Sequence, residues 1–126
     1  MTETDAVTFD TPAESLIESL HRDPEAVPFG AIGLGADLRV RTYNARESRE
    51  AGLAPERVLG KPMFAEVAPC MDNALVGERF VAGGELDETL DYLLTLRMRP
   101  TRVRLRLLAR PSDDVRWILV QRLSRG

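Results

Sequence analysis

Cys70 is the one cysteine in this chain of 126 residues. A lone cysteine cannot form an internal disulfide, and it cannot by itself build a metal site of cysteine ligands. Cys70 is therefore either a small core side chain or a reactive thiol, because the thiolate is the form that attacks an activated acyl group. Pro69 precedes it directly and limits the backbone at this point.

Tyr43 and Glu47 form a second candidate site, because they lie four positions apart. If residues 44–51 are helical, both side chains lie on one face and can converge on one ligand atom. A tyrosine hydroxyl donates a hydrogen bond, and a glutamate donates one when it is protonated. The alternatives are that Tyr43 is a core phenol with a local partner and that Glu47 is a solvated helix carboxylate.

His21 is the single histidine of the chain. One histidine has no companions for a metal site, so we expect His21 on the surface. A cysteine-dependent acyl-transfer enzyme needs a base beside its thiol, and His21 lies far along the chain from Cys70. We therefore expect a protein that is not an enzyme.

The composition is that of one globular domain with a real core. Hydrophobic residues make up 44% of the chain and charged residues 29%, and the net charge is −3. The longest apolar runs are far shorter than the roughly 20 residues of a membrane span. The first ten residues are acidic and polar, unlike a signal peptide. We expect a cytoplasmic protein that binds neither membrane nor nucleic acid.

The elements that position the candidate residues begin with an N-terminal cap. Residues 1–28 contain seven acidic side chains and one arginine. Behind Thr11-Pro12, apolar residues recur at helical spacing, at Leu16, Ile17 and Leu20. This pattern predicts a short helical cap over residues 1–28, followed by a core over residues 29–126.

The middle of the chain predicts a hairpin and then short helices. Apolar stretches at 31–34 and 38–43 flank a Gly-Ala-Asp turn, which is typical of two paired strands. Glycine and proline interrupt residues 44–71, so short helices and loops are expected there. Residues 74–82 predict a further helix that ends at Gly83, a residue type that tolerates the left-handed conformation.

The last third predicts an antiparallel meander of strands over 88–98, 101–109 and 115–123. Its middle strand alternates apolar residues with cations at Arg102, Arg104 and Arg106. The apolar face should be buried, and the cationic face should meet solvent, the acidic cap or a partner protein. Two strands, several short helices and three strands give an α+β fold with a five-stranded sheet of order 2-1-5-4-3, the PAS architecture.

Several segments resemble the photoactive yellow protein family in the same register. They are Phe29-Gly30-Ala31-Ile32, Tyr43-Asn44-Ala45-Arg46-Glu47, Gly60-Lys61 and Val67-Ala68-Pro69-Cys70. Similar residues follow downstream, with one gap between Phe80 and Leu86: Asp72, Phe80, Tyr92, Met98, Pro100-Thr101, Val103, Trp117 and Val120. The resemblance covers roughly residues 29–123.

This resemblance implies a blue-light photoreceptor with p-coumaric acid (4-hydroxycinnamic acid) held in a thioester to Cys70. It also implies that Tyr43 and Glu47 donate hydrogen bonds to the buried phenolate, next to Pro69. In the family, the counterpart of Met98 assists thermal reisomerisation. A buried phenolate is costly unless strongly hydrogen-bonded, and burial beside an anion favours a protonated, neutral Glu47 in the dark.

Light-driven isomerisation is then expected to draw the proton of Glu47 to the phenolate and to leave a buried carboxylate. An unpaired buried charge costs several kcal/mol, comparable with the stability of a small domain, so partial unfolding should follow. The cap is the part expected to loosen. An unidentified downstream signalling protein would read the change, and the protein itself should be a monomer or weak dimer.

Two positions depart from the family pattern. Leu53 stands where many members have an arginine that covers the chromophore, and Arg46 and Arg49 are the candidates to reach that space. Ala51 replaces a threonine whose hydroxyl supports the tyrosine. The alternative hypothesis is a PAS module for ligand sensing or protein interaction that never takes up a chromophore, with a structural or redox-active Cys70.

Overall fold

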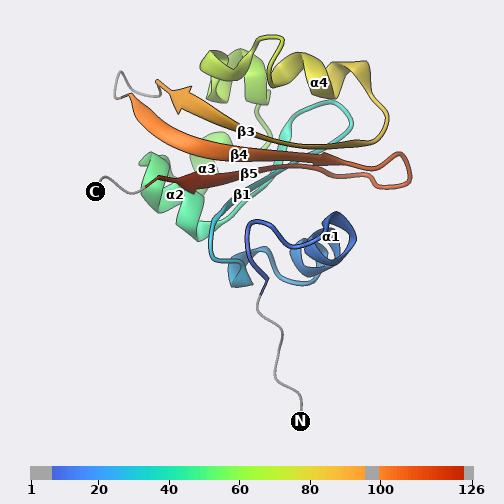
Figure 1. Cartoon of the computed structure of the whole chain (residues 1–126). Helices are drawn as coiled ribbons and strands as arrows, with labels where there is room; N and C mark the ends of the chain where they lie inside the picture. The colour runs from blue at the N-terminus through green and yellow to red at the C-terminus, as the bar shows by residue number, and fades with distance from the viewer. Residues whose placement is uncertain (1–6, 96–99, 124–126) are drawn as a thin grey trace.

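Five antiparallel strands form one sheet of order β2-β1-β5-β4-β3, as predicted (Figure 1). The structure is a computed structural model that describes residues 7–95 and 100–123. The strands are β1 (Gly30–Leu34), β2 (Val40–Tyr43), β3 (Leu86–Leu94), β4 (Thr101–Ala109) and β5 (Arg116–Arg122). The first strand pairs with the last, so the two ends of the fold meet in the middle of the sheet.

The helices are short, as the frequent glycines and prolines predict. They are α1 (Ala13–Arg22), α2 (Ala45–Ala51), α3 (Pro55–Val58) and α4 (Gly77–Ala82), with single turns of 3-10 helix at Pro24–Ala26 and Pro69–Met71 and a π-helical turn at Met63–Val67. Within the described ranges, no helix is long and apolar enough to cross a membrane.

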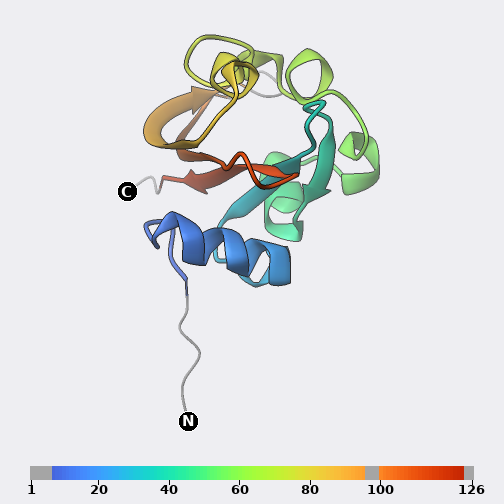
Figure 2. The same cartoon turned by 90° about the vertical axis from the view of Figure 1, so that its right-hand side faces the viewer.

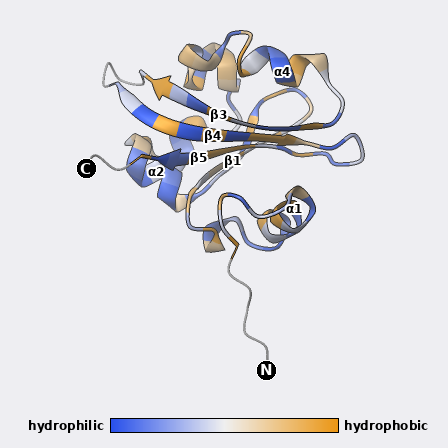
Figure 3. Ribbon diagram, in the orientation of Figure 1, coloured by the Kyte–Doolittle hydropathy of each residue, from blue (hydrophilic) through white to orange (hydrophobic). Residues whose placement is uncertain are grey.

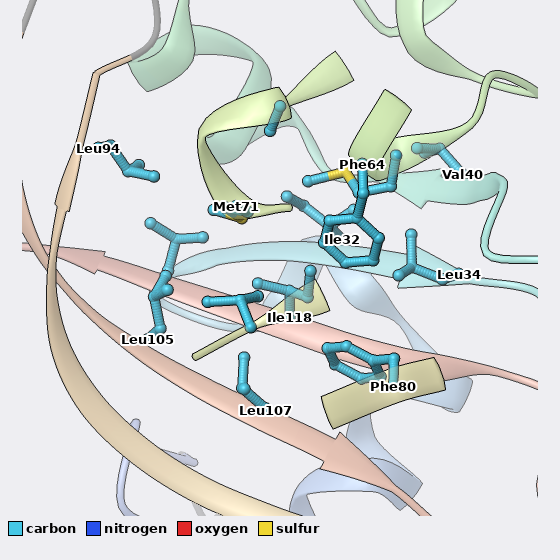
Figure 4. Close-up of a cluster of buried hydrophobic side chains, with 14 of the residues drawn as sticks. Ile32, Leu34, Val40, Phe64, Met71, Phe80, Leu94, Leu105, Leu107 and Ile118 are labelled. Atoms are coloured by element: carbon cyan, nitrogen blue, oxygen red, sulfur yellow. The ribbon is translucent and has the colours of Figure 1, made fainter. Parts of the chain in front are cut away.

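Each face of the sheet has its own apolar cluster because side chains alternate along the strands. In β4, Val103, Leu105 and Leu107 face the helices after β2, while Leu108 faces the other way. Figure 3 shows the alternation as successive hydrophilic and hydrophobic colours along β4. Figure 4 shows the helix-side cluster, where Phe64, Phe80, Met71 and other side chains pack on Ile32, Leu105 and Ile118.

The second cluster lies between the sheet and the N-terminal segment. Leu16, Ile17 and Leu20 of α1 are fully buried, and they pack with Trp117 and Leu119 of β5. Figure 2 shows α1 beneath the sheet, on the side opposite α4. The helical spacing of these three residues therefore predicted the buried side of α1 correctly.

Several element boundaries differ from the sequence prediction, most clearly those of α4 and β3. Helix α4 begins at Gly77, because the side chain of Asn73 accepts hydrogen bonds from the amides of Leu75 and Val76 and holds them in a turn. Strand β3 begins at Leu86, where it pairs with Ala109, and it ends at Leu94. The predicted strand residues 96–98 lie outside the described residues.

Arg106 connects the cationic face of β4 to the cap. Its guanidinium is buried and donates to the carbonyl oxygens of Phe9, at 3.0 Å, and Thr11, at 2.6 Å. It also forms a two-point ion pair with Asp87 of β3, at 2.9 and 3.1 Å. Arg106 therefore contacts the cap through its backbone rather than through its acidic side chains. The neighbouring Arg104 pairs with a carboxylate of the sheet itself.

His21 provides a second contact between α1 and the sheet. Its Nε2 lies 2.8 Å from Asp113 Oδ2 in the β4–β5 hairpin, and its ring meets Trp117 edge-on. The His21 side chain is 44% exposed, as expected for a surface residue. Partial burial raises the pKa of the Asp113 carboxyl, but hydrogen bonds with His21 and the Val115 amide outweigh it, so this pKa lies below its ordinary value.

Asp113→Asn is expected to lower the free energy of unfolding by less than about 1 kcal/mol, because the pair is at the surface. The folded-state pKa of Asp113 is lowered, so its contribution is present above the unfolded pKa of about 3.9 and is lost as the pH falls through the folded pKa. Urea denaturation between pH 2 and 7 should show the two proteins converging in acid. Asp114→Asn is the control, and an equal loss there would contradict the assignment.

Candidate functional site

Asn44 sets the start of α2 and thereby the position of Glu47. It is fully buried, and its Oδ1 accepts hydrogen bonds from the amides of Glu47 and Ala31, each at 3.0 Å. Its Nδ2 donates to the carbonyl oxygens of Phe29, at 3.1 Å, and Pro24, at 3.0 Å. One side chain therefore caps the helix and ties it to the segment that enters β1.

Glu47 points from α2 into the protein, where only 1% of its surface is exposed. Its carboxyl occupies the space beside Gly30 of β1, where a Cβ atom would collide with Oε1. This burial excludes the alternative that Glu47 is a solvated helix carboxylate. Glycine at position 30 is thus a requirement of the site, because no other residue type leaves room for the acid.

Arg122, the last residue of β5, is the ion-pair partner of Glu47. Its Nη1 lies 2.5 Å from Oε1 and its Nη2 lies 3.3 Å from Oε2. The Arg122 side chain is 17% exposed, and Nη1 also approaches Glu50 Oε1 at 3.4 Å. The sequence analysis missed this residue, although position 122 continues the helix-side row of Ile118 and Val120 along β5.

Burial is the dominant influence on the acidity of Glu47 and Tyr43. It raises the pKa of the Glu47 carboxyl, and contact with Arg122 partly opposes that rise. Burial also raises the pKa of the Tyr43 hydroxyl, and the neighbouring Glu47 charge adds to this rise. Both groups are thus biased towards the protonated form, which is the form that donates a hydrogen bond.

Cys70 lies in the 3-10 turn Pro69–Met71 and is partly exposed. Its carbonyl oxygen accepts hydrogen bonds from Tyr92 Oη, at 2.6 Å, and Asn73 Nδ2, at 3.3 Å, while the same Nδ2 lies 2.6 Å from Tyr92 Oη. Two side chains from different elements therefore fix the backbone that carries the thiol. The sequence analysis assigned neither residue to the site. Only folding brings Tyr92 of β3 against this turn, whereas Asn73 lies three positions from Cys70 and could have been found as a local side-chain contact with the backbone.

The remaining predicted site residues surround this arrangement. Tyr43 belongs to the helix-side core cluster, and Leu53 and Cys70 pack against the same cluster. Ala51 ends α2 and is half-buried, and Pro69 is exposed. Met98 lies outside the residues that the structure describes. The structure thus brings Tyr43, Glu47 and Cys70 to one side of the sheet.

The two arginines considered for the space near Leu53 have side chains at the surface of α2. Arg46 pairs with Glu50 on the surface of α2, at 3.2 Å, and Arg49 is exposed. Arg122 is instead the guanidinium that enters the site, 75 positions from its partner Glu47. A contact between such distant positions cannot be deduced from helical spacing on α2.

Sheet order and helix placement define a domain of the PAS fold. The domain of this fold from an HTR-like protein of Haloarcula marismortui matches with a TM-score of 0.60 at 23% identity, over 87% of this chain and 96% of that one. No family model matches the chain.

Two curated proteins, both called photoactive yellow protein, identify the family. That of Halochromatium salexigens is 37% identical over 117 residues, 90% of this chain and 94% of its own. That of Rhodothalassium salexigens is 37% identical over 98 residues, 75% of this chain and 78% of its own. The crystal structure of the photoactive yellow protein domain of the sensor histidine kinase Ppr from Rhodospirillum centenum matches with a TM-score of 0.71 at 37% identity, over 79% and 90% of the two chains. The chain belongs to the photoactive yellow protein family and is a photoreceptor of the PAS fold.

Gly30→Ala should displace the Glu47 carboxyl and lower the free energy of unfolding by about 1 to 3 kcal/mol, the usual cost of overpacking. Beyond Oε1, the new methyl group would lie 3.2 Å from both Cβ and Cδ of Glu47. Gly35→Ala is the matched control, because the three atoms nearest to its methyl group would belong to the guanidinium of the exposed Arg41. Denaturation curves measure both losses, and equal losses would show that Gly30 has no special role.

Proposed function

We propose that this chain senses blue light through p-coumaric acid bound as a thioester to Cys70. The observation that carries the proposal is the buried pair Tyr43 and Glu47, two groups biased towards their protonated forms on the same side of the sheet as the single thiol. Two proton donors in an apolar surrounding suit a phenolate oxygen, because hydrogen bonds to a charged acceptor are strong there.

The residues present fit such a group. The thiol of Cys70 is partly exposed and can react, while its carbonyl is already held by Tyr92 and Asn73. The coumaroyl group, when bound, supplies absorption of visible light and isomerisation about its double bond. Tyr43 Oη and the protonated Glu47 carboxyl then donate hydrogen bonds to its phenolate oxygen.

Glu47 is the proposed proton donor. It holds its proton in the dark because burial disfavours its charged form. Glu47 would be the residue that supplies this proton to a bound phenolate after illumination, and it would then be a buried carboxylate. Such a charge is a large perturbation for a small domain, and the proposed result is partial unfolding. Ala51, Leu53, Pro69 and Met98 remain proposed neighbours of the chromophore.

The proposed output is a change of shape that a separate signalling protein reads, without catalysis. The relatives carry the name of a photoactive protein and not of an enzyme, and one of them is a domain of a sensor histidine kinase. A lone thiol also suits the reducing cytoplasm, which is the proposed location. We further propose a monomer or weak dimer, with a cap over residues 1–28 that loosens from the core over residues 29–126.

Reconstitution tests the proposal. The purified protein is mixed with an activated derivative of p-coumaric acid, and whole-chain mass and visible spectrum are recorded in the dark and after blue light. We expect one covalent coumaroyl group, a yellow colour, and a reversible loss of that colour in light. A chromophore-free PAS module with a structural or redox-active Cys70 predicts no adduct, and that result would overturn the proposal.

A further inference from the structure

Arg122 is a cation placed where the proposed function creates a negative charge. Within residues 7–95 and 100–123, Arg122 is the only cationic residue that forms an ion pair with Glu47. It contacts both carboxyl oxygens. Two-point contact of this kind is the strongest arrangement of a guanidinium and a carboxylate. The pair is largely shielded from water, with side-chain exposures of 17% and 2%.

We propose that Arg122 is a positioning residue that holds the Glu47 carboxylate whenever Glu47 lacks its proton, and so controls how readily Glu47 releases it. This inference rests on the proposed function for its role in light sensing. The groups that face Glu47 are Tyr43 from β2, Glu50 from α2 and Arg122 from β5. Tyr43 carries no charge, and Glu50 carries a repelling one. Among the residues that the structure describes, only Arg122 therefore compensates the carboxylate.

Arg122 also retains an anionic partner when Glu47 is protonated. Its Nη1 lies 3.4 Å from Glu50 Oε1, at the edge of hydrogen-bond distance, while Glu50 itself is 30% exposed. A small movement of the guanidinium towards Glu50 keeps it paired near solvent. Arg122 is therefore stabilised in both protonation states of Glu47, whereas Glu47 alone would carry an uncompensated buried charge in one of them.

The first test needs no chromophore. The Glu47 side-chain carboxyl is followed by carbon NMR during a pH titration of the chromophore-free protein, with its signal assigned by its loss in Glu47→Gln. Removal of the cation in Arg122→Gln should strengthen proton binding by Glu47 at least about tenfold, equal to one unit upward in its pKa. Arg122→Lys keeps the charge but not the two-point geometry, and should give a smaller shift.

Arg116→Gln is the matched control, because Arg116 lies on the same strand and donates only to the Asp114 carbonyl among the described contacts. It should leave the titration of Glu47 unchanged. An unchanged titration in a folded Arg122→Gln protein would overturn the inference. If the Arg122→Gln protein does not fold, the Arg122→Lys protein provides the test. A Glu47 titration in Arg122→Lys identical to that of the parent protein would also overturn the inference.

The second test uses the reconstituted protein and separates the two proposals. The Arg122→Gln protein should form the adduct in normal yield, but its light state should decay at least about threefold faster because the Glu47 carboxylate lacks its partner. A normal adduct with an unchanged lifetime overturns the role of Arg122 in sensing and leaves the proposed function intact. If the parent protein forms no adduct, the proposed function fails, and the titration still decides whether Arg122 controls Glu47.

Discussion

The Cys70→Ser protein should fold normally and remain colourless after treatment with activated p-coumaric acid. The visible absorption band that the parent protein gains in this treatment should be completely absent. The thiolate is the nucleophile in this acylation, and a serine hydroxyl is not ionised at neutral pH. The side chain is only partly buried, so the substitution should change the free energy of unfolding by no more than about 0.5 kcal/mol. Whole-chain mass and visible absorption measure the result.

Met71→Leu is the control for this experiment, since it alters the adjacent residue with little change of volume and keeps the thiol. It should become as yellow as the parent. Colour and added mass in the Cys70→Ser protein would show that attachment occurs at another residue. Denaturation of both variants establishes that loss of colour is not loss of folding.

Arg106→Met should detach the cap from the sheet and lower the free energy of unfolding by roughly 2 to 4 kcal/mol, the largest stability effect that we expect. The buried guanidinium donates to the carbonyl oxygens of Phe9 and Thr11 and pairs with Asp87. Methionine fills much of the volume but leaves those two carbonyls without this donor, and each hydrogen bond to a charged group contributes about 1.5 to 3 kcal/mol.

Hydrogen exchange distinguishes local detachment from general destabilisation. Amides of α1 should exchange faster by a factor of about 30 for a loss of 2 kcal/mol, before those of β4 and β5 change. Arg104→Met is the matched control, because Arg104 lies on the same face and pairs with the exposed Asp91. It should cost less than about 1 kcal/mol. Equal exchange in both variants would contradict the anchoring role of Arg106.

Local sequence patterns determined much of the fold. Alternating arginine and apolar residues predicted the bounds of β4 correctly, because side chains of a strand alternate between its two faces. The apolar spacing before His21 likewise predicted α1 and the side that it buries. The predicted start of α4 was wrong because the side chain of Asn73 holds the preceding amides in a turn.

The candidate site was predictable only in part. Tyr43, Glu47 and Cys70 were selected from residue type and spacing together with the family resemblance. The structure places them on one side of the sheet, and their roles stay predictions. Arg122 and Tyr92 were not selected, because each reaches the site from a strand far along the chain. Their roles depend on which strands become neighbours.

The sequence by itself determined that one thiol is available and that a tyrosine and a glutamate lie four positions apart, since no other cysteine exists and spacing is a covalent property of the chain. Tertiary structure alone decided which charge meets Glu47 and which donors hold the cap and the Cys70 carbonyl. Helical and strand periodicity describe contacts between near positions. Pairing of β1 with β5 instead depends on joint burial of both faces of the sheet, and this long-range packing places Arg122 beside Glu47.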